Sequence, residues 1–135
     1  MLKLKSQEFT LEAAIENVLQ FLSETQNYKR ILPENQIADF QSTPTQFSFK
    51  AAGQIHLTLE KQEANNELLH FKGASSNPFA FDLFVRMQQV QNSTKGYIEI
   101  HADVNMMLKM LIEKPLQKLL TEMVNNLAIE LSEGQ

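Results

Sequence analysis

The chain of 135 residues contains no cysteine and has only four glycines and four prolines. Without cysteine the protein has no disulfides, no thiolate nucleophile and no cysteine-ligated metal. Few glycines and prolines, with 43% apolar and 21% charged residues, are typical of a globular domain and exclude a fibrous or disordered chain. We expect one domain over residues 1–135, located in the cytoplasm.

The sequence also lacks an excess of positive charge and a long apolar run. Lys and Arg number 12 against 16 Asp and Glu, a net charge of -4, and no segment concentrates basic residues. Nucleic acid is therefore not an expected partner. The longest apolar segment, Met106 to Ile112, is interrupted by Lys109, and the N-terminus alternates Leu with Lys. We expect neither a targeting segment nor integral membrane association.

The first third of the chain predicts a strand, a helix and a short apolar insert. Residues 2–5 alternate Leu and Lys, as in a strand with one wet face. Thr10 can cap a helix that ends near residues 26–27. A short insert from Tyr28 to Pro33 follows. The apolar residues at helical spacing are Leu11, Ala14, Ile15, Val18, Leu19 and Leu22.

From Gln36 onward the apolar period is two for almost seventy residues, which predicts a run of antiparallel strands. Turns are expected at residues 65–66, 75–78 and 91–94. A 65–66 turn would place His70 opposite about Lys61. The apolar residues expected on one shared face are Phe47, Phe49, Ala51, Ile55, Leu57, Leu59, Leu69, Phe71, Phe79, Phe81, Leu83, Val85, Met87, Ile98, Ile100, Ala102 and Val104.

A long helix closes the chain. Asn105 can cap it, and apolar residues keep the helical period from Leu108 to Leu131. Pro115 lies inside this pattern, so we expect a kink around residues 112–114. Segregated strands and helices predict an α+β fold in which the long helix covers the apolar face of the sheet.

With this order of elements, the chain resembles the START-like (SRPBCC) helix-grip superfamily over essentially its whole length. Residues 18–22, 27–28 and 31–33 resemble the first helix and the proline-ended insert of that superfamily, and residues 104–107 and 114–116 resemble its helix entry and kink. The resemblance implies a single START-like domain over residues 1–135, in which a curved antiparallel sheet of six to seven strands wraps around a long C-terminal helix. It also implies a hydrophobic ligand between sheet and helix.

The candidate site is the space between the sheet and the last helix. We favour non-enzymatic binding of a small hydrophobic or amphipathic molecule, such as a lipid, with the helix and the insert at residues 28–33 as its gate. The alternative is a protein–protein interaction module whose core these side chains fill completely. The side chains expected to line the cavity are Phe47, Phe49, Leu57, Phe71, Phe79, Phe81, Leu83, Ile100, Met107, Met110 and Leu111.

Catalysis by a cyclase-like or hydrolase-like enzyme is a third hypothesis. We expect no metal and no cofactor, because His56, His70 and His101 all alternate onto the polar face. No catalytic residue is assigned; Asp39 is the one acidic residue whose orientation the pattern leaves open. Phe84 is an outward aromatic, and a neighbouring aromatic patch would favour a homodimer or a protein partner.

Overall fold

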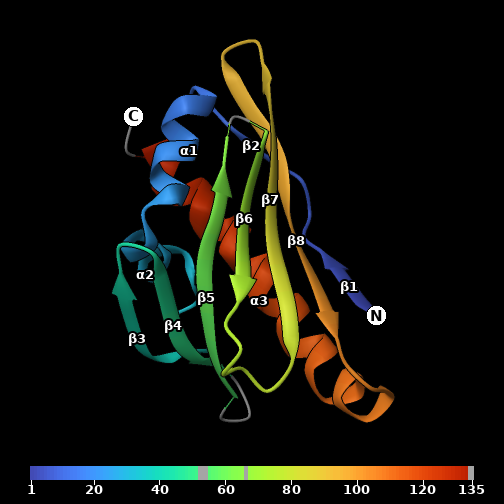
Figure 1. The fold of residues 1–135 in the computed structure, drawn as a ribbon. Helices are drawn as coiled ribbons and strands as arrows, with labels where there is room; N and C mark the ends of the chain where they lie inside the picture. The colour runs from blue at the N-terminus through green and yellow to red at the C-terminus, as the bar shows by residue number, and fades with distance from the viewer. Residues whose placement is uncertain (52–54, 66, 134–135) are drawn as a thin grey trace.

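One antiparallel sheet curves around a long C-terminal helix in the computed structural model, which describes residues 1–51, 55–65 and 67–133 (Figure 1). The strands are β1 (Leu2–Lys5), β2 (Phe9–Leu11), β3 (Ala38–Thr43), β4 (Gln46–Ala51), β5 (Ile55–Ala64), β6 (Leu68–Gly73), β7 (Ala80–Val90) and β8 (Ser93–Asp103). The helices are α1 (Ile15–Ser23), the 3₁₀ turn η1 (Thr25–Asn27), α2 (Tyr28–Ile31) and α3 (Met106–Glu133).

The described residues form an eight-stranded sheet in the order β1-β8-β7-β6-β5-β4-β3, with β2 also paired to β8. The α+β helix-grip class is confirmed, and the strand count exceeds the six to seven expected because Phe9–Leu11 adds a strand. The long β7–β8 hairpin runs from Ala80 opposite Asp103 to Val90 opposite Ser93. It lies beside the edge strand β1, and α3 crosses the sheet diagonally (Figure 1).

The period-two pattern of the strands is confirmed by their burial. On β7, Phe81, Leu83, Val85 and Met87 are buried, whereas the residues between them are half-buried. Each apolar side chain removed from water in this way stabilises the fold by roughly 1.5–3 kcal/mol. The alternation therefore fixes which face of the sheet the helix covers.

The predicted helix cap at Thr10 is wrong, because Thr10 lies in β2 opposite Lys95. Helix α1 begins only at Ile15, after Ala14 as its cap residue. The backbone N–H of Ile15 donates to Oε1 of Gln89 at 2.8 Å. A side chain from a distant strand thus accepts a backbone N–H that the first turn of the helix leaves without an intrahelical partner. No local motif in the sequence could indicate this contact.

The β5–β6 register also differs from expectation. Of the predicted turn, Asn66 lies outside the described residues, and Oδ1 of Asn65 accepts the N–H groups of Glu67 and Leu68. A register shift between Lys61 and Glu63 places His70 opposite Glu63 rather than opposite about Lys61. The extra residue moves the pairing along the strand.

The cap predicted for the last helix is confirmed, since the N–H of Leu108 donates to Oδ1 of Asn105 at 2.8 Å. Helix α3 then continues through Pro115 as one helix, and the kink there stays a prediction. Its buried face packs against the sheet and against α2. The buried residues of this face are Ile112, Leu116, Leu119, Leu120, Met123, Val124, Leu127 and Leu131.

At the start of α3, side chains that were expected to face the interior are exposed to solvent. Met107, Met110 and Leu111 are 75%, 76% and 68% exposed. In Figure 1 the first turns of α3 extend past the end of β8, at the lower right. Met107 and Met110 therefore point to solvent where α3 passes the end of the sheet, and placing them in the interior was wrong.

Candidate functional site

Two small apolar voids lie between the sheet and α3. The first, which we call the outer void, has a volume of about 30 Å³. It lies between the first half of α3, the ends of β4 and β5, and the segment before β7. Its lining residues are Gln36, Ala51, Ile55, Leu57, Phe79, Leu111, Ile112, Pro115, Leu116 and Leu119.

The second, the inner void, has a volume of about 20 Å³ and reaches further along α3 toward α2. All of its lining side chains are apolar. They are Leu32, Phe47, Phe49, Leu57, Leu59, Phe79, Phe81, Leu83, Ile100, Leu116, Leu119 and Met123.

The two voids are neighbours, because Leu57, Phe79, Leu116 and Leu119 line both of them. Leu57 belongs to the sheet and the two leucines to α3, while Phe79 stands just before β7. The voids together form a row that starts at the half-buried Gln36 and the exposed Leu111 and ends deep in the core. Movement of Phe79 would join them.

The size of the voids matters for what they can hold. A cavity of about 150 Å³ lined by Leu, Ile and Phe can bind a benzene-sized molecule, and drug-sized ligands occupy roughly 300–1,000 Å³. Voids of about 30 and 20 Å³ are therefore too small for such a ligand as they stand. In this conformation the interior is nearly filled by its own side chains.

The described lining of the two voids is almost entirely apolar. Among the described lining residues, Gln36 contributes the one polar side chain. Asp39, the acidic residue of open orientation, is exposed, has φ 54° and lies 3.6 Å from Nζ of Lys50. It therefore lies outside the interior. The described lining residues include no titratable side chain that could serve as a positioned acid or base.

Tyr28 closes the inner end of the site. Its ring is fully buried and its hydroxyl donates to the backbone O of Leu22 at 2.8 Å. Burial raises the pKa of Tyr28 above its usual range, because the phenolate would have to form without water. Its neutral hydroxyl is thus a fixed structural donor, and the ring packs on Phe47 and Phe71.

The residues predicted to line the cavity fall into three groups. Phe71 is fully buried but packs in the core beside Tyr28. Met107 and Met110 lie on the surface. Those that border one of the voids are Phe47, Phe49, Leu57, Phe79, Phe81, Leu83, Ile100 and Leu111.

Sequence reasoning missed the contribution of the middle of α3. Leu116, Leu119 and Met123 border the inner void. Their helical spacing was visible in the sequence and could have identified them. The start of the same periodic stretch was chosen instead, because a periodic pattern does not tell where the covering sheet ends.

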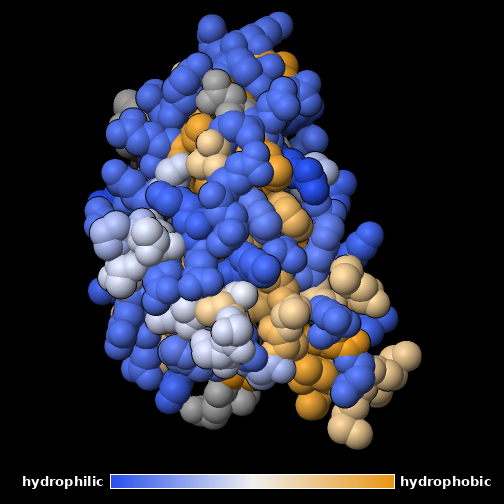
Figure 2. Space-filling model, in the orientation of Figure 1, coloured by the Kyte–Doolittle hydropathy of each residue, from blue (hydrophilic) through white to orange (hydrophobic). Residues whose placement is uncertain are grey.

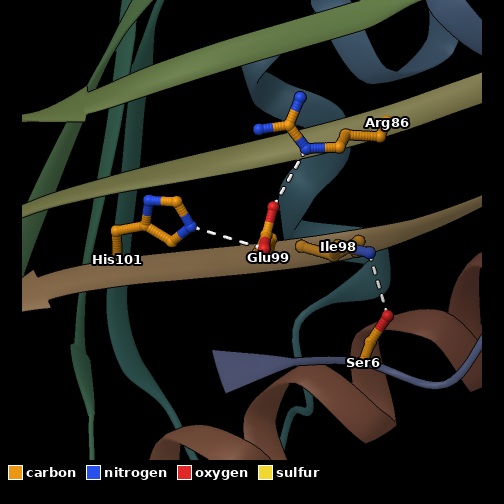
Figure 3. A network of polar contacts seen from close by, with 5 residues as sticks. All are labelled: Ser6, Arg86, Ile98, Glu99 and His101. Carbon is orange, nitrogen blue, oxygen red and sulfur yellow. Dashed lines mark hydrogen bonds and ion pairs between the residues drawn. The ribbon is translucent and has the colours of Figure 1, made fainter. Parts of the chain in front are cut away.

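A polar network lies on the opposite face of the sheet (Figure 3). Arg86 from β7 and His101 from β8 both point toward Glu99: Nε of Arg86 donates to Oε1 at 2.9 Å, and Nε2 of His101 lies 3.4 Å from Oε2. Burial alone would raise the pKa of Glu99, but the hydrogen bond from Arg86 and the nearby His101 and Arg86 charges outweigh it and hold that pKa below its usual range.

Phe84 stands beside this network and is half-buried rather than a lone exposed aromatic. The ring of His70 stacks on it at 4.6 Å between centroids, and the guanidinium of Arg86 lies 5.1 Å from its centroid. Oδ1 of Asp82 lies 2.7 Å from Nε2 of the same His70. Within the described part of the chain these side chains form no three-residue group suited to a metal.

Comparison at the level of sequence gives no match, either to a family model or to a curated protein. Solved structures do superpose on nearly the whole chain. A START superfamily protein from Mycobacterium smegmatis has a TM-score of 0.70 at 13% identity, covering 98% of this chain and 99% of that one. The Aha1 dimer from Colwellia psychrerythraea gives 0.67 at 13% identity, covering 100% and 99%.

The di-domain ARO/CYC protein BexL from the BE-7585A biosynthetic pathway gives a TM-score of 0.66 at 12% identity, covering 100% of this chain and 48% of that one. Identities this low show the fold alone. The resemblance to the START-like helix-grip fold is thereby confirmed, and what these proteins bind or make remains a property of each of them.

Proposed function

We propose that the protein binds a small hydrophobic or amphipathic molecule between its sheet and α3, without catalysing a reaction. The observation that carries this proposal is the row of two adjoining apolar voids, which share Leu57, Phe79, Leu116 and Leu119. Packing faults are usually scattered, whereas these lie end to end along the buried face of one helix and lead outward to the exposed Leu111.

Binding requires the interior to open. The gain is the burial of apolar ligand surface, at roughly 25 cal/mol per Å², so a ligand that buries about 200 Å² gains on the order of 5 kcal/mol before the cost of opening. Because Gln36 is the single polar side chain among the described lining residues, the site should distinguish ligands by shape and size more than by polar groups.

The opening is better placed at the outer void than at the insert. The insert is tied down: the ring of Tyr28 stacks on Phe47, and Nδ2 of Asn126 donates to the O of Ile31 at 2.9 Å. At the outer void, Leu111 is already exposed and Phe79 lies in the connection between β6 and β7. Rotation of Phe79 would admit a ligand with little disturbance of the sheet.

The fold shared with the solved structures supports the proposal, since one of them is an ARO/CYC protein of a biosynthetic pathway and another a START superfamily protein. Those descriptions belong to the other proteins. They make a ligand between sheet and helix a reasonable hypothesis for this chain.

The test begins with native mass spectrometry of the purified protein, followed by denaturing extraction of whatever is bound. Binding is then measured in solution with the apolar fluorophore N-phenylnaphthylamine. Leu116→Trp places a bulky ring where the two voids meet, and we expect it to weaken probe binding by about tenfold. Phe79→Ala enlarges the same space and should strengthen binding or speed probe entry.

Ile129→Trp is the matched control, because Ile129 lies on α3 but is 52% exposed, away from the voids. It should leave probe binding unchanged. Thermal unfolding of each variant separates loss of the site from loss of the fold. If Leu116→Trp and Phe79→Ala both fold and neither alters binding, no ligand lies between the sheet and α3.

A second function is favoured by the small volume of the voids. A helix-grip protein with a filled core would act as a protein–protein interaction module, using its surface rather than its interior. A bare mass in native spectrometry, with no probe binding by the wild type, would support this module over the ligand-binding protein. The same spectrum would report whether the chain forms a homodimer.

A further inference from the structure

The start of α3 presents a group of apolar side chains to solvent. Met106, Met107, Met110 and Leu111, which we call the α3 tip, are each more than two thirds exposed. Figure 2 shows apolar residues gathered at the lower right of the molecule, where α3 begins beyond the end of the sheet. Single exposed apolar residues are common on protein surfaces, but four together on a projecting end indicate a contact surface.

Basic side chains continue the same stripe of the helix. Met107, Leu111, Lys114 and Lys118 follow at the i, i+4, i+7 and i+11 spacing of one helical face, and both lysines are exposed. The acidic neighbour Glu113 is half-buried and lies off this face. Glu113 follows Met106 and Met110 instead, so in a chain of net charge -4 the stripe behind Met107 and Leu111 is the locally positive one.

We propose that the α3 tip inserts into the interfacial layer of an anionic lipid bilayer, with Lys114 and Lys118 against its phosphate groups. Apolar side chains at the front and lysines one to two turns behind match the layers of a membrane surface, where acyl chains lie beneath negatively charged headgroups. Among the described residues no helix is long and apolar enough to cross a membrane, so the contact is peripheral.

A second copy of the chain fits this surface less well. A stable protein interface covers about 800 Å² and roughly 20 residues per partner. The four side chains of the tip, on a projecting end rather than a broad flat face, fall short of that. A symmetric contact through the same stripe would also bring Lys114 and Lys118 of the two copies near one another.

The tip also adjoins the site described above, because Leu111 both belongs to it and lines the outer void. If the proposed function holds, a docked tip would place the entrance of the ligand site at the lipid surface. This step rests on the proposed function. Docking itself rests on the exposed tip and the lysines alone.

The test is sedimentation with vesicles of phosphatidylcholine alone and of phosphatidylcholine containing about one third phosphatidylglycerol. We expect the wild type to bind the anionic vesicles, and binding to fall as salt is raised. Met107→Ser with Met110→Ser should weaken binding by about tenfold or more, and Lys114→Glu with Lys118→Glu by a similar factor.

Matched controls separate the tip from general effects. Ile129→Ser removes an exposed apolar side chain further along α3, and Lys29→Glu with Lys95→Glu makes the same change of charge elsewhere. Both should bind anionic vesicles within about twofold of the wild type. All the substituted side chains are exposed or partly exposed, and circular dichroism melting verifies that each variant folds.

The proposal is overturned if the wild type does not bind anionic vesicles. It is also overturned if the Met107→Ser, Met110→Ser variant binds them as tightly as the wild type. A concentration-dependent dimer that the methionine variant abolishes, without vesicle binding, would assign the tip to a second copy instead. Leu116→Trp keeps the two proposals apart: in the absence of lipid it should weaken probe binding by about tenfold, while vesicle binding persists.

Discussion

The ring of Tyr28 lies flat on the ring of Phe47, with centroids 4.4 Å apart and planes inclined by 11°. This contact joins α2 to β4 and closes the inner end of the space between sheet and helix. The hydroxyl of Tyr28 adds a hydrogen bond to the O of Leu22. One side chain therefore links α1, α2 and the sheet.

Tyr28→Phe should lower the free energy of unfolding by about 1–2 kcal/mol, since it removes a buried hydrogen bond but keeps the ring. Tyr28→Ala also opens a cavity and should lower it by about 3–5 kcal/mol. Urea unfolding measures both losses: with an unchanged m-value, the shift of the midpoint urea concentration gives the change in the free energy of unfolding. Tyr97→Phe is the control: Tyr97 is half-buried, and its hydroxyl should be worth less than about 0.5 kcal/mol.

Gly96 and Gly73 both lie too close to neighbouring atoms to accept a side chain, and we predict that substitution costs more stability at Gly96 than at Gly73. A Cβ at Gly96 would lie 2.1 Å from the backbone O of Arg86, which cannot move without disturbing the β7–β8 ladder. A Cβ at Gly73 would lie 2.6 Å from the ring of Phe81 and 2.9 Å from Nδ2 of Asn77, side-chain atoms that have more freedom to shift.

We therefore expect Gly96→Ala to destabilise the fold by about 2–4 kcal/mol and Gly73→Ala by about 1–2 kcal/mol. Chemical denaturation of the two variants measures the difference. Equal losses, or a larger loss at Gly73, would contradict the rigidity assigned to the backbone of the β7–β8 hairpin.

The lowered pKa of Glu99 predicts a pH dependence with a defined sign. Glu99 ionises more readily in the folded chain than in the unfolded one, so its carboxylate stabilises the fold above the ordinary glutamate pKa. That contribution is lost as pH falls through the lowered folded-state pKa. Wild type should therefore exceed Glu99→Gln in stability near neutral pH and lose this advantage below about pH 5.

Denaturation of both proteins across the acid range measures this difference, which should not exceed about 1 kcal/mol because Arg86 is partly exposed. The control is Glu8→Gln, which removes a solvent-exposed ion pair with Lys95 at 3.7 Å. An advantage of the wild type that grows toward low pH would contradict the assignment.

We predict that Phe84 contributes more to the stability of the fold than an outward aromatic on a polar strand face normally does. An outward aromatic on a polar strand face would be nearly neutral to substitution, but here His70, His101 and Arg86 all pack on the ring. Phe84→Ser should lower the free energy of unfolding by about 1–2 kcal/mol. Val90→Ser, at the exposed end of the same strand, should cost less than about 0.5 kcal/mol.

The same variant tests the outer face as an interface. Native mass spectrometry of wild type and Phe84→Ser compares their oligomeric states at equal concentration. If the wild type is a dimer and Phe84→Ser is a folded monomer, the outer face is the interface and the interaction module gains support. If the oligomeric state is the same in both proteins, Phe84 contributes only to packing within its own chain.

Local patterns were sufficient for much of the fold. The alternation on β7 predicts its buried face, and the predicted cap of α3 at Asn105 is confirmed. Both depend on neighbours within a few residues, where side-chain direction follows from the backbone geometry. Thr10 shows the limit of such reasoning, since pairing with Lys95 overrode a sound local cap signal.

The sequence by itself determined the class of the fold, the order of its elements and the apolar character of its interior, because periodicity records which side chains avoid water. Only the tertiary structure decided how much room the interior leaves and where the sheet stops covering α3. Those properties depend on how side chains from distant strands fill a shared volume and on the relative lengths of elements that meet only after folding. Leu111 and Leu116 illustrate this: they belong to one periodic stretch, yet one is 68% exposed and the other 6%.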